Sequence, residues 1–222
     1  MTAATFAPTQ AASVDGLVVL PHVRWETYER LLDDHLDASV PHFTSDRGVL
    51  EIVSPSTPHE EGNRTLALLV EVVAEELGID VRNVGSMTFK REDLQRGFEP
   101  DSSFYIQHED RVSGRVQIDL AVDPPPDLVI KIEVTNPRLD KRSVYAAMGI
   151  PEVWVLGRHG MVILRHDGDR YEDADRSLVL PPLDRAILGQ FVAASRTLKR
   201  TAWLKQVRAW VRTGQRALNA DE

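Results

Sequence analysis

The N-terminal part of the chain shows two spacings of apolar residues, one typical of helices and one typical of strands. Within residues 25–36 the apolar side chains recur every three or four positions, which predicts an amphipathic helix. The turn sequence Asp46-Arg47-Gly48 then separates Phe43 from an apolar run at residues 49–53. We therefore expect a β-hairpin after the first helix.

A second, longer helix is predicted after a proline-rich break. Thr57 has the side chain of a helix N-cap, and Pro58 suits the first helical position. Apolar residues keep a helical spacing to about Leu77, and Gly78 provides a C-terminal stop. The pattern therefore predicts a helix over residues 57–77.

The rest of the chain alternates short strands with helices. Strands are predicted near residues 81–84, 87–90, 103–107, 127–134, 151–156 and 161–166, and a helix over 138–148. After residue 181, apolar residues return at helical spacing and predict a helical tail. This order predicts an α/β protein, in which helices flank a mixed β-sheet. We expect a flexible N-terminus (1–16), a main domain (17–184) and a C-terminal helical extension (185–222).

Composition and charge narrow the class of protein. The 222 residues include no cysteine, which excludes disulfides and thiolate metal sites. No segment has the order of a signal peptide or is apolar enough to span a bilayer, so we expect a cytoplasmic protein without a membrane partner. The formal net charge of −8 argues against a broad basic surface for nucleic acid. A local basic rim beside an acidic site remains compatible with this charge.

The strand predicted at residues 127–134 carries two opposite charges on one face. Because side chains alternate along a strand, Lys131 and Glu133 point the same way, about 7 Å apart. Charges on a central strand are costly to bury unless they are paired or bind a metal. From this pattern alone the pair is either a salt bridge on an exposed face or part of a site.

The segment Glu99-Pro100-Asp101 favours a site. A proline–acid step that opens a strand, followed by a strand with an acid and a lysine two residues apart, is similar to the layout of PD-(D/E)XK phosphodiesterases. In that layout two carboxylates, here Asp101 and Glu133, hold Mg²⁺ or Mn²⁺, which are hard ions that prefer oxygen ligands. The metal polarises the scissile phosphate, and a neighbouring lysine, here Lys131, stabilises the developing negative charge.

The resemblance extends over most of the chain and is to a particular family, not only to the superfamily. The resembling stretches are residues 50–56, His59-Glu60, residues 97–106, 124–130, Asp140-Lys141 and 145–154. Together they resemble a family of restriction-endonuclease-like proteins that is abundant in cyanobacteria and was long known only as a domain of unknown function. Membership implies a restriction-endonuclease-like fold and a metal-dependent nuclease core.

The resemblance also implies roles for single residues. Glu60 would orient a metal-bound water, and Asp101 would be the first metal ligand. The chain departs from the family pattern at Lys131, where the family usually has an acid, so the superfamily order acid-x-Lys becomes Lys-x-acid with Glu133. Glu60, Asp101, Lys131 and Glu133 are therefore the predicted catalytic residues, with weak metal binding because a lysine at a carboxylate position repels a cation.

The sequence leaves several functions open. The leading one is a Mg²⁺-dependent DNA endonuclease weakened by Lys131, and the alternative is an inactive nuclease fold that binds DNA or a protein partner. A third is hydrolysis of RNA or another phosphodiester. Basic residues of the tail form either a solvated face or phosphate contacts, while Trp203 and Trp210 are expected in the core or at a homodimer contact. Convergence of Glu60, Asp101 and Glu133 around one void would favour the enzyme.

Overall fold

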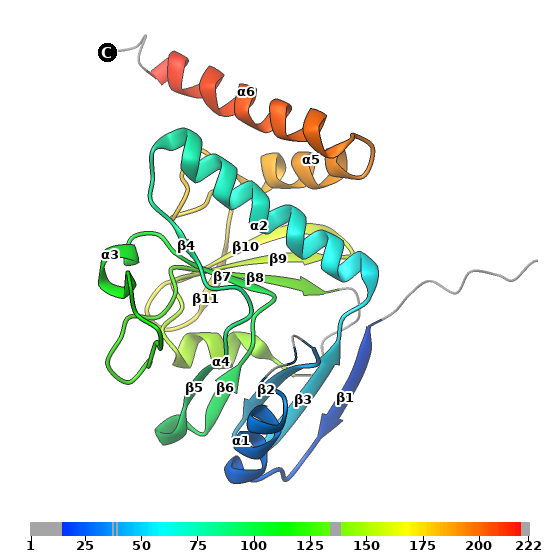
Figure 1. The fold of residues 1–222 in the computed structure, drawn as a ribbon, viewed down its shortest axis with the longest axis vertical. Coiled ribbons are helices and arrows are strands. Elements are labelled where there is room, and N and C mark those ends of the chain that lie inside the picture. Colours follow the sequence, from blue (N-terminus) through cyan, green and yellow to red (C-terminus); the bar gives the residue numbers. More distant parts are fainter. Residues whose placement is uncertain (1–14, 37, 39, 134–138, 219–222) are drawn as a thin grey trace, which may run out of the picture.

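The structure, a computed structural model, describes residues 15–36, 38, 40–133 and 139–218. Within these residues the chain forms two β-sheets with six α-helices around them, as Figure 1 shows. The predicted mixed α/β class is thereby confirmed. The single sheet expected from the sequence is instead divided into two.

The first sheet is built mostly from the N-terminal part of the chain. Its strands are β1 (Gly16–Leu20), β2 (His42–Asp46), β3 (Val49–Ser54), β5 (Phe89–Arg91) and β6 (Arg96–Phe98), in the order β1-β3-β2-β6-β5. All of its pairs are antiparallel. Helix α1 (Trp25–Asp34) packs on this sheet through its apolar stripe, so that Tyr28 and Leu50 are fully buried.

The second sheet carries the candidate site. Its strands are β4 (Arg82–Asn83), β7 (Ser102–Tyr105), β8 (Leu128–Glu133), β9 (Glu152–Gly157), β10 (Gly160–His166) and β11 (Tyr171–Ala174), in the order β11-β10-β9-β8-β7-β4. Strands β8 and β9 pair in parallel, and the chain between them includes helix α4 (Lys141–Ala147). The other pairs are antiparallel.

Three helices cover one face of the second sheet. Helix α2 (Thr57–Leu77) crosses it, while α5 (Arg185–Ser195) and α6 (Arg200–Leu218) lie farther along the same side (Figure 1). Apolar residues from all three helices join those of β8, β9 and β10 in one buried core. A second core, which includes residues of α4, lies on the opposite face, and the short helix α3 (Glu109–Val112) lies in the loop after β7. The C-terminal helices therefore share a core with the sheet.

Several predicted boundaries are corrected by the structure. Ser56, not Thr57, is the N-cap of α2, because its backbone is extended while Thr57 is already helical. The strand predicted at 103–107 ends at Tyr105, since the Asp127 carboxylate accepts hydrogen bonds from the backbone N–H groups of Ile106 and His108. Strands β1, β6 and β11 were not predicted, because short strands carry little periodic signal.

Parts of four predicted segments lie outside the described residues. These are residues 1–14 of the N-terminal segment, residue 134 of the central strand, residue 138 of the following helix and residues 219–222 of the C-terminal extension. Helix α4 is described from Lys141, with the Asp140 side chain accepting a hydrogen bond from the Arg142 backbone N–H as its cap.

Candidate functional site

Asp101 and Lys131 meet because of the register between β7 and β8. Ser102 pairs with Ile130 across this antiparallel ladder, so one further step places Asp101 directly opposite Lys131. The Lys131 Nζ donates hydrogen bonds to both oxygens of Asp101, at 3.0 Å to Oδ1 and 2.9 Å to Oδ2. Only 3% of Asp101 and 6% of Lys131 is exposed. The predicted site residues therefore form a buried ion pair.

Asp101 has further donors on the sides that Lys131 leaves free. The Ile132 backbone N–H donates to Oδ2 at 2.6 Å, and the imidazole nitrogens of His59 and His42 lie 3.1 and 3.4 Å from Oδ1. Burial by itself raises the pKa of Asp101. The charge of Lys131 and the contacts with His42 and His59 outweigh burial, so the pKa lies well below its usual value. The carboxylate is therefore ionised, with Lys131 and the Ile132 N–H as its hydrogen-bond donors and two imidazoles close by.

His59 extends this ion pair toward the N-terminus. Its Nδ1 lies 2.9 Å from Oδ2 of Asp15, while its Nε2 faces Asp101. The other oxygen of Asp15 accepts a hydrogen bond from the backbone N–H of Ser56 at the start of α2. Asp15, His59, Asp101 and Lys131 thus form a buried chain in which two carboxylates alternate with a histidine and a lysine, here called the charge chain.

The charge chain leads us to expect a stability that depends on the protonation of His59. Burial lowers the pKa of His59, and Lys131 acts in the same direction, but Asp101 and Asp15 outweigh them and the pKa is raised. A histidine whose pKa is higher in the folded state than in the unfolded state stabilises the folded protein. This contribution is complete below the unfolded-state pKa, about 6.5. We therefore expect the free energy of unfolding to fall as pH rises through the raised pKa of His59.

Urea unfolding over a range of pH tests this expectation. His59→Gln should remove the loss of stability on the alkaline side that the wild-type protein shows in this interval. His159→Gln, at an exposed histidine, is the matched control and should keep the wild-type profile. An identical alkaline profile in wild type and His59→Gln would contradict a protonated His59.

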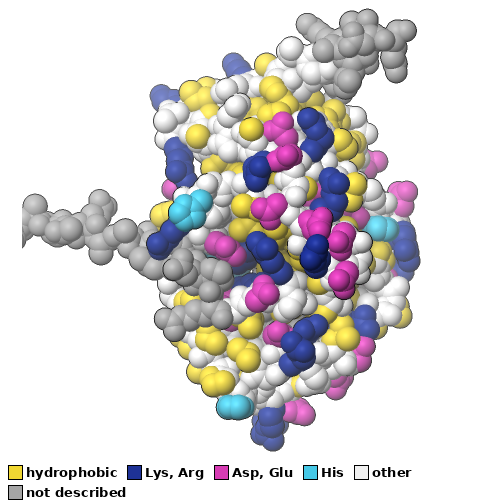
Figure 2. Space-filling model, turned by 180° about the vertical axis from the view of Figure 1, so that it is seen from behind, with side chains coloured by type: hydrophobic (Ala, Val, Ile, Leu, Met, Phe, Trp, Pro, Cys, Tyr) yellow, Lys and Arg dark blue, Asp and Glu magenta, His cyan; other side chains and the backbone are white. Residues whose placement is uncertain are grey.

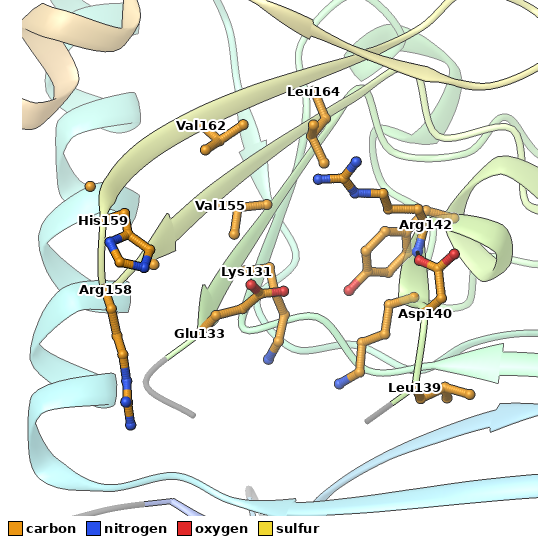
Figure 3. A pocket seen from close by; sticks show the side chains of 14 residues that line it. Lys131, Glu133, Leu139, Asp140, Arg142, Val155, Arg158, His159, Val162 and Leu164 are labelled. Carbon is orange, nitrogen blue, oxygen red and sulfur yellow. Dashed lines mark hydrogen bonds between the residues drawn. The ribbon is translucent and has the colours of Figure 1, made fainter. Parts of the chain in front are cut away.

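Lys131 and Glu133 line one pocket, as the strand pattern predicts. The pocket has a volume of about 520 Å³ and opens between the end of β8, the start of α4 and the β9–β10 turn (Figure 3). Its charged lining residues are Lys131, Glu133, Asp140, Lys141, Arg142 and Arg158. Four are cations and two are anions, but Lys131 and Lys141 are each paired with a carboxylate, Asp101 and Glu51, so the other cations of the lining are Arg142 and Arg158. Burial raises the pKa of Glu133, while the charges of Lys131, Lys141 and Arg142 act in the opposite direction.

Lys141, at the start of α4, is a second lysine of this pocket. Its Nζ lies 2.6 Å from Oε1 of Glu51 on β3, and 10% of its side chain is exposed. Burial and then the charge of Lys131 lower the pKa of Lys141, while Glu51 acts in the opposite direction. Two lysines, Lys131 and Lys141, therefore face the pocket, each with a buried carboxylate as its partner.

Glu60 lies apart from this pocket. It is half-buried in the first turn of α2, and its Oε2 lies 3.7 Å from the Arg64 Nε. Glu60 and Asp101 line a second groove of about 540 Å³, whereas Glu133 lines the first pocket. The three predicted acids do not line one cavity. Within the described residues, no three His, Asp or Glu side chains are grouped so that they could hold a metal ion.

The residues present do not fit a divalent metal at Asp101. Mg²⁺ needs carboxylate oxygens at about 2.0–2.1 Å with octahedral space around it. Both oxygens of Asp101 already accept from Lys131, and Oδ2 also accepts from the Ile132 N–H. A divalent ion would have to displace an ammonium group that is itself buried. We therefore assign no metal-dependent step to this arrangement.

The C-terminal helices α5 and α6 pack against the rest of the protein, and part of their positive charge is paired within it. Trp203 is 2% exposed, and its indole N–H donates to the Phe191 carbonyl, which confirms the core placement expected for it. Arg208 and Arg212 on α6 form ion pairs with Glu76 on α2. Their charges are thus already matched within the protein. Lys199, Arg200 and Lys205 are exposed.

The chain is similar to a solved structure and matches a family model. One similar solved structure is the crystal structure of a putative nuclease belonging to DUF820 from Anabaena variabilis, with 16% sequence identity and a TM-score of 0.47. The alignment covers 72% of this chain and 98% of that one. No significant match was found among curated proteins. Among the described residues, no helix is long and apolar enough to cross a membrane.

A family model matches the chain over most of its length. The model is that of Uma2, described as "Putative restriction endonuclease", and it matches residues 25–198. This span includes the charge chain from His59 onward, the pocket and both sheets apart from β1. The match confirms the family resemblance, and the chain belongs to the Uma2 family of restriction-endonuclease-like proteins.

Proposed function

We propose that this protein binds DNA through Arg142 and Arg158, the exposed cations of the pocket in its nuclease fold, and that its Mg²⁺- or Mn²⁺-dependent cleavage of phosphodiester bonds is weak or absent. The observation that carries this proposal is the Lys131–Asp101 ion pair, which occupies the carboxylate on which metal-dependent cleavage would rely. Family membership favours a nucleic-acid phosphodiester as the ligand. The protein would thus keep the fold of a nuclease family while Lys131 occupies the place of a divalent metal ion at Asp101.

The pocket supports phosphate binding by its charges. Arg142 on α4 and Arg158 at the β9–β10 turn are exposed and lie on opposite sides of Lys131 and Glu133 (Figure 3). One guanidinium group can bind two oxygens of a phosphate at once, through two N–H groups in a fixed geometry. Figure 2 shows positive and negative side chains intermixed on the opposite face from Figure 1, without a broad basic surface there. Local contacts at the pocket therefore suit this chain better than extensive coating of DNA.

DNA binding at the pocket is tested by the salt dependence of affinity. Each phosphate contact adds about 0.9 to the slope of log affinity against log salt for duplex DNA. We expect Arg142→Gln/Arg158→Gln to reduce the slope by about 1.8, twice that value, measured by fluorescence anisotropy with a labelled duplex. The matched control, Arg200→Gln/Lys205→Gln, removes the same charge from the exposed side of α6 and should keep the wild-type slope.

Other outcomes would contradict parts of the proposal. A slope lowered only in the α6 variant would place the DNA contact on the tail. Tighter binding to an RNA duplex of the same sequence would change the ligand to RNA. Brisk plasmid cleavage with Mg²⁺, lost in Lys131→Glu, would make Lys131 a catalytic lysine and the protein an active endonuclease.

A further inference from the structure

The Lys131 ammonium occupies the position of a cation bound by Asp101. Its Nζ lies almost symmetrically between the two carboxylate oxygens, at 3.0 and 2.9 Å. A cation bound by both oxygens of a carboxylate lies in this symmetric position. The Nζ–oxygen distances are those of an ammonium group and are longer than those of a metal ion. Because Asp101 and Lys131 are opposite each other on paired strands, the backbone fixes this arrangement.

Burial of the Lys131–Asp101 pair keeps the Lys131 ammonium group beside the carboxylate. Side-chain exposure is 7% for Lys131 and 0% for Asp101, so water does not screen the pair. His59 and the Ile132 N–H approach the same carboxylate from other directions. Removal of the ammonium would leave an ionised carboxylate buried, which is strongly unfavourable. A metal ion could therefore enter only with the loss of this pairing.

We infer that Lys131 is a built-in cation that replaces a divalent metal at Asp101 and makes this protein indifferent to Mg²⁺ and Mn²⁺. The inference concerns metal binding and does not depend on whether DNA is the ligand of the pocket. It also implies that a single side chain, Lys131, excludes divalent metals from Asp101. With a carboxylate at position 131, Asp101 and Glu133 would flank it, and the three oxygen-bearing groups would attract a hard divalent cation.

Metal titration of folded protein without DNA tests the inference. Calorimetry with MnCl₂ should detect no binding to the wild-type chain, and its melting temperature should be the same in MnCl₂ and in EDTA. Lys131→Glu should bind Mn²⁺ more tightly than wild type by about tenfold or more, or about 1.4 kcal/mol. Mn²⁺ should raise the melting temperature of this variant, since binding to the native state stabilises it.

A matched control separates the site from net charge. Lys90→Glu makes the same change in charge at a lysine that is 44% exposed and paired with Glu29 on α1. It should bind Mn²⁺ no more tightly than wild type. An equal gain in Lys90→Glu would attribute the effect to net charge and overturn the inference.

A second variant covers the case in which Lys131→Glu does not fold. Lys131→Gln removes the ammonium but adds no charge, and it should gain weaker Mn²⁺ binding that is lost again when Asp101→Asn is added. No gain in the folded Lys131→Gln protein would overturn the inference. So would Mn²⁺ binding by the wild-type chain that Asp101→Asn abolishes.

Discussion

Replacing Lys131 with methionine is expected to lower the free energy of unfolding by about 3–5 kcal/mol. The reason is the charge left behind, because Asp101 would keep its position between β7 and β8 without its cation. Both side chains are almost fully buried, so water could not solvate the remaining carboxylate. Urea unfolding of wild type and Lys131→Met, both at neutral pH, would measure the difference.

The double variant Lys131→Met/Asp101→Asn distinguishes lost charge balance from lost packing. The Asn oxygen can still accept from the Ile132 N–H, and no buried charge remains unpaired. We expect the double variant to be more stable than Lys131→Met alone, so that the two changes are strongly non-additive. Lys90→Met, which breaks the exposed pair with Glu29, is the control and should cost roughly 0–1 kcal/mol. Additive effects would show that the ion pair contributes little.

Ending the chain at residue 198 is expected to abolish cooperative folding. The change removes α6, whose Trp203, Val207 and Val211 are 2%, 0% and 3% exposed in the core shared with α2 and the second sheet. Burial of three such side chains contributes roughly 5–9 kcal/mol, at about 1.5–3 kcal/mol each. This is comparable to the whole stability of an ordinary domain, about 5–15 kcal/mol.

Thermal unfolding followed by circular dichroism would measure the effect of this truncation. A control in the full-length chain, Arg208→Gln/Arg212→Gln, removes only the ion pairs with Glu75 and Glu76 on α2. It should lower the melting temperature far less than the truncation does, because it leaves the buried side chains of α6 in place. If the truncated chain unfolds at the wild-type temperature, the helical tail is a separable extension rather than part of the folding unit.

The sequence predicted the helices and the central strand, since these depend on contacts between residues close in the chain. The spacing of apolar residues in α1 and α2 follows from 3.6 residues per turn, and it placed both helices within a few residues. Alternation along β8 likewise placed Lys131 and Glu133 on one face, where both line the pocket. These features need no knowledge of the rest of the fold.

Resemblance to a family supplied what periodicity could not. The proline–acid step before β7 and the scattered stretches around it led to the nuclease family, which the match over residues 25–198 confirms. The resemblance also predicted that Lys131 departs from the family pattern. It gave no information on which groups surround Asp101 in this chain, because departures from a family pattern change local contacts in ways that the pattern does not contain.

Tertiary structure alone decided how the charges are paired. The register of β7 against β8 sets Asp101 opposite Lys131, and the fold brings Asp15 to His59 and Glu51 to Lys141 from distant parts of the chain. It also separates Glu60 from Glu133 into different cavities. Strand register and helix placement result from the packing of the whole core, whereas sequence periodicity reports only which face a residue occupies. Residue types therefore indicated the chemistry, and long-range packing determined that Lys131 is paired with Asp101.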